Sequence, residues 1–219
     1  MKARTLVRLP LRTVSVVLLL ASIAPPALAE KSDRFGVRAG VNLSAFTGEF
    51  GDLVKPDNRV APNIALFYEH AFAPELAFHT ELGYSGKGGT AKNEGADPFG
   101  NPSTIRVDWK FEYLEVPLLL RCRWPGKVTP FFEIGPSLGV ALAGKITSDP
   151  ALFGDLDVKH DMKPIDLGWA AGAGVEFAAG PGRIGLEARY ARGFSDLYDI
   201  SDNFASINQA WTFALSYSR

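Results

Sequence analysis

Two of the three histidines have carboxylates near enough in the chain to suggest chemistry. His79 stands two residues before Glu81, so both side chains would share one face of an extended strand. His160 lies in a polar stretch that also holds Asp155, Asp157 and Asp161. Such groups suit a general base or a calcium site. The aspartates all come from one loop, however, and runs of charge usually mark a solvated surface.

Other motifs that carry chemistry are missing from the sequence. It contains no glycine-rich phosphate loop, no Cys/His metal cluster and no serine nucleophile motif. We therefore expect no catalytic residue, no metal and no cofactor, and a protein that is not an enzyme. A rim enzyme that acts on lipid or peptide stays open as an alternative, with His160 and Asp157 as the residues to test.

A larger set of charged residues alternates with apolar ones. Between Arg183 and Tyr190, every second residue from Ile184 is apolar or small, and the charges of this stretch fall on the opposite face. This two-residue period indicates a β-strand. Across the chain it predicts nine charged residues on one shared polar face: Arg38, Glu69, Glu81, Glu115, Arg121, Glu133, Glu176, Glu187 and Arg189.

Eight stretches with this period follow one another along the chain. They cover about 34–44, 61–70, 75–87, 104–123, 128–143, 165–178, 183–195 and 205–218. Short turns rich in Pro and Gly join the second strand to the third, the fourth to the fifth and the sixth to the seventh. Longer polar loops cover about 45–60, 88–103, 144–164 and 196–204. Alternating short and long connections are typical of outer-membrane barrels, with turns in the periplasm and loops outside.

The composition of the two faces favours lipid outside the barrel. The polar face is rich in Gly, Ala and Ser, which pack poorly on a solvated strand but leave room for long charged side chains in a narrow interior. Aromatic residues gather near strand ends of the apolar face, as in the girdles of membrane barrels. A soluble barrel around a ligand is the alternative. Inside an eight-stranded barrel the nine charges should pair, because an unpaired buried charge costs several kcal/mol; a polar path for ions or protons is the functional alternative.

The fourth strand departs from a simple alternation. Its apolar positions change parity near Tyr113 and Leu114. A β-bulge at this point would restore one continuous apolar face. Alternatively, the first half of the strand projects beyond the membrane, where neither face must be apolar.

The first 29 residues have the pattern of a secretory signal peptide, with four basic residues, an apolar stretch and a small-residue cleavage site at Ala27–Ala29. We therefore expect one domain, residues 30–219. Its formal charge is −5, from 19 basic and 24 acidic residues, which argues against a nucleic-acid partner. The single cysteine, Cys122, excludes an internal disulfide.

Several motifs, taken in order, resemble the PorT-like outer-membrane β-barrel family. They include Gly36–Asn42, Glu81–Gly88, Tyr113–Leu120, Gly135–Gly139, Gly172–Glu176 and Leu186–Tyr190. The resemblance implies an eight-stranded barrel in the outer membrane and assigns no activity. Barrels of this kind usually end in an aromatic residue. In this chain the last aromatic residue, Tyr217, is followed by Ser218 and Arg219.

Together these observations predict an all-β, eight-stranded antiparallel up-and-down barrel in the outer membrane of a Gram-negative bacterium. We expect a structural role or binding through the loops; a small porin or transport component is a further alternative. The expected partners are outer-membrane lipid and the barrel-assembly machinery, and the expected state is a monomer. The sequence leaves open the ligand, conduction through the lumen and the role of the long loops.

Overall fold

The computed structural model describes residues 33–96, 102–149, 155–197 and 206–219, so the expected signal peptide lies outside the described residues. The elements are β1 (Asp33–Thr47), α1 (Glu49–Val54), β2 (Asp57–Ala71), β3 (Leu76–Ala96), β4 (Pro102–Arg123), β5 (Val128–Asp149), β6 (Leu156–Asp157), the 3-10 helix η1 (Lys159–Asp161), β7 (Ile165–Ala179), β8 (Gly182–Gly193) and β9 (Ile207–Ser218). Neither described helix is long and apolar enough to cross a membrane.

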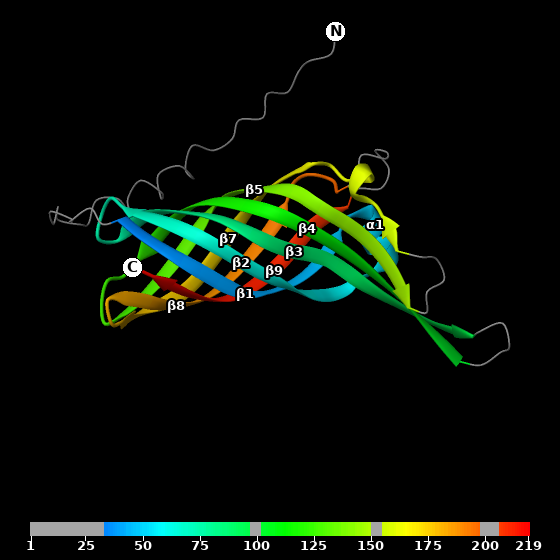
Figure 1. The fold of residues 1–219 in the computed structure, drawn as a ribbon, viewed down its shortest axis with the longest axis horizontal. Coiled ribbons are helices and arrows are strands. Elements are labelled where there is room, and N and C mark those ends of the chain that lie inside the picture. Colours follow the sequence, from blue (N-terminus) through cyan, green and yellow to red (C-terminus); the bar gives the residue numbers. More distant parts are fainter. Residues whose placement is uncertain (1–32, 97–101, 150–154, 198–205) are drawn as a thin grey trace, which may run out of the picture. The chain divides into compact units, whose positions relative to one another are not determined.

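Eight of the strands form a closed antiparallel barrel (Figure 1). Each strand pairs with its neighbours in the chain, β4 pairs with β5, and β1 pairs with β9 to close the ring. Phe35 and Arg219 extend the β1–β9 pairing with two backbone hydrogen bonds of 2.9 Å. The short β6 only adds to the end of β5. The predicted eight-stranded barrel is confirmed, and every predicted strand end lies within nine residues of the observed end.

The barrel is apolar outside and charged inside. Leu66, Leu186 and Leu215 on the outer wall are 63%, 48% and 57% exposed, whereas Glu69, Glu133 and Arg121 inside are at most 3% exposed. In water this arrangement would expose a continuous apolar belt and bury charge. It is the arrangement of a barrel whose outer wall faces lipid.

The connections differ in length at the two ends of the barrel. At the end that we call the turn end, β2–β3, β4–β5 and β7–β8 are joined by four, four and two residues. Gly180 in the last turn has a φ of 58°, a conformation that most other residues adopt only with strain. At the opposite end, the loop end, the chain forms α1, β6 and η1. By the outer-membrane pattern, the turn end faces the periplasm and the loop end faces outside.

The expected loop at about 88–103 is wrong, because both strands continue through most of it. β3 and β4 remain paired as far as Ala96 and Pro102. β2 pairs with β3 only as far as Thr90, and β5 pairs with β4 only as far as Arg106. The hairpin therefore extends past the barrel as a two-stranded arm, which projects from the loop end (Figure 1). The arm has polar residues on both faces, so its sequence lacks the apolar alternation that would predict a strand.

The expected bulge in the fourth strand is also misplaced. β4 pairs with β3 without a register shift, so its aromatic residues before Leu114 point into the barrel. A register shift does occur beside Tyr113, but the extra residue belongs to β5: Glu112 pairs with Ala143 and Tyr113 with Ala141, leaving Leu142 unpaired. The parity change near Tyr113 therefore marks the point where the inner face itself becomes apolar.

These inward aromatic residues form a cap near the loop end of the interior. Phe111 and Tyr113 are at most 1% exposed, and Trp109 packs edge-to-face on Phe46 with ring centres 5.4 Å apart. Met162 from the β5–β7 connection and the other apolar members complete this aromatic cap: Ala91, Ala141 and Leu197. The apolar side chains of the cap are buried inside the barrel. From the sequence alone, apolar side chains of the strands are expected to face lipid.

Candidate functional site: the charged interior

The interior is filled by ion pairs between side chains of both signs. Among the described residues, the interior pairs join seven cations (Arg34, Arg38, Lys87, Arg121, Arg123, Arg183 and Arg189) with seven anions (Glu69, Glu81, Glu115, Glu133, Asp166, Glu176 and Glu187). This equality limits the cost of burying charge, since each carboxylate meets at least one cation. The pairs fall into three clusters along the barrel.

The turn-end cluster is centred on Arg121. Its guanidinium lies 2.9 Å from Glu69, 3.0 Å from Glu176 and 2.6 Å from Glu133, measured between nitrogen and oxygen. The same group lies 4.1 Å above the ring of Phe131, a cation–π geometry. Three further arginines surround these carboxylates on the side of the turns: Arg34, Arg123 and Arg183.

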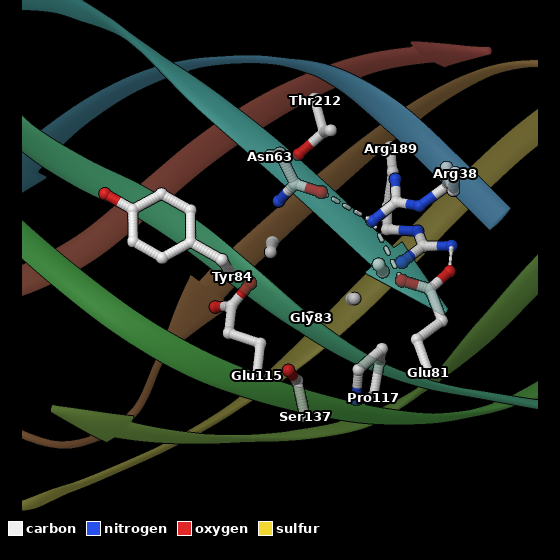
Figure 2. Close-up of a pocket in the computed structure, with 13 residues that line it drawn as sticks. Arg38, Asn63, Glu81, Gly83, Tyr84, Glu115, Pro117, Ser137, Arg189 and Thr212 are labelled. Carbon is white, nitrogen blue, oxygen red and sulfur yellow. Dashed lines mark hydrogen bonds and ion pairs between the residues drawn. The ribbon is translucent and has the colours of Figure 1, made fainter. Parts of the chain in front are cut away.

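The middle cluster is centred on Glu81 (Figure 2). One carboxylate oxygen accepts a hydrogen bond of 2.8 Å from Arg38, and the other accepts one of 2.6 Å from Arg189. His79 Nε2 lies 3.0 Å from Glu81, and Glu187 lies 2.9 Å from Arg189 Nε. The adjoining cavity has only about 20 Å³ for the centres of water molecules, room for one or two of them.

The loop-end cluster lies next to the aromatic cap. Lys87 Nζ is 2.5 Å from Glu115 and 3.9 Å from Asp166, and it lies 5.1 Å from the centre of the Tyr113 ring. Asn208 donates hydrogen bonds of 3.0 Å to Tyr113 and 3.1 Å to Asp166. Toward the loop end, the side chains that fill the interior thus change from polar to aromatic within one layer.

All nine residues of the predicted charged face lie inside the barrel. Eight are buried, and the side chain of Glu115 is 17% exposed. Sequence reasoning omitted Lys87, Asp166 and His79 from the set, although their parity already placed them on that face. It also omitted the arginines beside the turns, Arg34, Arg123 and Arg183, although each has the parity of the charged face of its strand.

The structure does not assemble a site around His160. This residue is exposed on η1, and the nearest recorded contact of the aspartates is a hydrogen bond of 2.9 Å from the Lys159 backbone N–H to Asp157. Within residues 33–96, 102–149, 155–197 and 206–219, no three His, Cys, Asp or Glu side chains are grouped as metal ligands. Asp155 and Asp161 are likewise exposed.

Comparisons with known proteins agree with this architecture. The sequence profile of the outer membrane protein beta-barrel domain family matches residues 29–199. The crystal structure of Neisserial surface protein A shares the fold, with a TM-score of 0.50 and 12% identity, over 86% of this chain and 98% of that one. Ail of Yersinia pestis aligns with a TM-score of 0.44 and 14% identity, over 86% and 99% of the two chains. OprG of Pseudomonas aeruginosa aligns with a TM-score of 0.42 and 11% identity, over 86% and 97%. No curated protein matches the chain in sequence.

Proposed function

We propose that this chain, which belongs to the outer membrane protein beta-barrel domain family, is a non-enzymatic barrel with a sealed lumen. It resides in the outer membrane and acts through its surface and its loop end, as a structural or binding protein, and does not transport solutes. Within the family we propose a PorT-like member from a Gram-negative bacterium, on the ordered motifs such as Glu81–Gly88 and Tyr113–Leu120.

The sealed lumen is the observation that carries this proposal. An eight-stranded barrel has an interior only wide enough for side chains. Here, three clusters of ion pairs occupy it, and the aromatic cap covers them near the loop end. An ion that entered would have to displace charge-assisted hydrogen bonds such as Arg189–Glu81, which shorten to 2.6 Å.

The two-stranded arm supports a role in binding outside the cell. It carries Lys92 beyond the last β2–β3 pairing and Arg106 at the last β4–β5 pairing, and both side chains are exposed. A hairpin that pairs only with itself contributes little to barrel closure. Its length is therefore better explained by contact with a partner than by stability of the fold.

Recording from planar lipid bilayers tests the proposal. We expect no conductance steps from the refolded barrel, with a large porin as the positive control for insertion. Regular steps would overturn the sealed lumen and favour a small porin. Mass spectrometry of lipid A and phospholipids from cells that produce the protein tests the rim enzyme: a modification that disappears in His160→Ala or Asp157→Asn would overturn the non-enzymatic role.

A further inference from the structure

The turn end of the lumen opens into a basic vestibule. Its walls are formed by Arg34, Pro74, Arg123, Pro125, Gly126, Thr129, Glu176 and Arg183, and it encloses about 400 Å³ accessible to water. The three arginines come from β1, β4 and β8, which are separated in the sequence but meet here around one opening. The middle cluster, by contrast, leaves room for only one or two waters.

Positive charge is in excess at this opening. The turn-end cluster has four cations (Arg34, Arg121, Arg123 and Arg183) and three anions (Glu69, Glu133 and Glu176), which leaves +1. In the middle cluster Arg38 and Arg189 match Glu81 and Glu187 in number, and Arg189 also lies 2.6 Å from Glu133 of the turn-end cluster, so the two clusters together keep the excess of +1. The loop-end cluster has one lysine against Glu115 and Asp166, which leaves −1. The unbalanced cation therefore lies where the interior meets the periplasm.

Two of the guanidinium groups keep a donor that protein atoms do not use. Arg123 donates from Nε to the Pro74 carbonyl at 2.9 Å and from Nη1 to Glu69 at 2.7 Å. Arg183 donates from Nε to Glu176 at 3.0 Å and from Nη2 to Thr129 at 2.6 Å. Among the described residues, Nη2 of Arg123 and Nη1 of Arg183 make no hydrogen bond, and neither belongs to the buried unpartnered atoms. Both nitrogens are thus held in place and open to solvent.

We propose that the vestibule binds a phosphate group carried by a soluble molecule of the periplasm. Guanidinium groups are the preferred partners of phosphate, because several N–H donors meet several oxygens in fixed geometry. Arg123 and Arg183 donate from their free nitrogens, and the charge of Arg34 behind them adds to the attraction. The site lies at the turn-end opening, between strand ends and turns and not on the apolar outer wall, which favours a soluble ligand over a membrane lipid. This inference rests on the barrel geometry alone and survives if the lumen proves to conduct.

Isothermal titration of the full mature barrel in zwitterionic micelles with inorganic phosphate tests the proposal, at an ionic strength held constant with chloride. We expect saturable binding that weakens about tenfold in Arg183→Gln and in Arg123→Gln, as for the loss of one charge-assisted hydrogen bond. Arg192→Gln is the matched control, since this exposed arginine lies on the outer wall of β8 and should leave affinity unchanged. Heat-modified gel migration verifies folding of each variant.

Each remaining outcome decides against the site. Absence of saturable phosphate binding to the wild type would overturn it, and this measurement needs no variant to fold. Equal affinity in wild type and Arg183→Gln would show that the arginines serve only to neutralise Glu69 and Glu176. If short-chain phosphatidylglycerol bound at these arginines and free phosphate did not, the ligand would be a lipid headgroup, which contradicts a soluble ligand.

Discussion

At the scale of residues, Arg121 holds the interior together. Its guanidinium contacts carboxylates from four other strands: Glu69 of β2, Glu133 of β5, Glu176 of β7 and Glu187 of β8. Its side chain is 4% exposed. β5 pairs directly with β4, but β2, β7 and β8 do not, so one arginine links β4 to three strands that it does not touch through the backbone.

We expect Arg121→Met to reduce the free energy of unfolding by about 3–5 kcal/mol, the usual cost of leaving buried charges without their partner. Methionine keeps much of the side-chain volume, so loss of charge dominates the change. Urea unfolding in lipid vesicles measures the effect. The double variant Arg121→Met with Glu133→Gln should recover part of the loss, because one uncompensated carboxylate is removed. Equal stability of Arg121→Met and wild type would show that the ion pairs are dispensable.

The sequence predicts which side chains enter the lumen but not which of them meet. Parity alone placed Arg38 and Glu81 on one polar face, since a strand has a period of two. Their contact also requires the relative shift of β1, β2 and β3, which depends on pairing across the whole sheet. For Trp109 and Phe111, parity did not predict even the face of the barrel correctly. Apolar side chains were assigned to lipid, although a filled lumen offers them an equally dry environment near its end.

At the scale of elements, the bulge in β5 determines which of the last residues of this strand point into the barrel. With Leu142 unpaired, Gly144 points inward and Lys145 is exposed. An ideal Cβ on Gly144 would lie 2.3 Å from Met162 Sδ, so this inward position has no space for a larger side chain. Without the bulge, strict alternation would place Ala143 at this crowded site and would turn Lys145 inward at the next inward position.

Deleting Leu142 should therefore be tolerated. The deletion joins Ala141 and Ala143 in regular alternation and leaves the facing of Gly144 unchanged, so we expect a folded barrel that loses about 1 kcal/mol or less. Deleting Ile134 from the same strand is the matched control. It would turn Leu138 and Val140 into the charged lumen, and we expect no folded barrel. Heat-modified gel migration and urea unfolding compare the two. Similar behaviour of both deletions would mean that the bulge does not set the facing of β5.

At the scale of the whole molecule, the barrel reverses the usual distribution of polarity. The outer wall resembles the core of a soluble protein, and the interior pairs seven cations with seven anions, four of the cations being buried. The alternation could be predicted because the residues of each strand face lipid and the charged lumen in turn, so that apolar and polar residues alternate. The arm could not, because its two faces meet similar surroundings and leave no periodic signal.

The layered interior predicts which substitutions open the barrel. Removing the aromatic cap with Trp109→Ala and Phe111→Ala should cost about 3–5 kcal/mol for each buried aromatic residue, yet leave the lumen closed, because the ion-pair clusters remain below it. Replacing Arg38, Glu81, Glu187 and Arg189 together by alanine removes equal numbers of both signs and should open the middle of the barrel. Planar-bilayer recording should show no conductance steps from either change or from the two combined, because the turn-end cluster around Arg121 still fills its end of the lumen. Steps from the cap variant alone would place the seal in the aromatic cap and contradict a lumen closed by ion pairs.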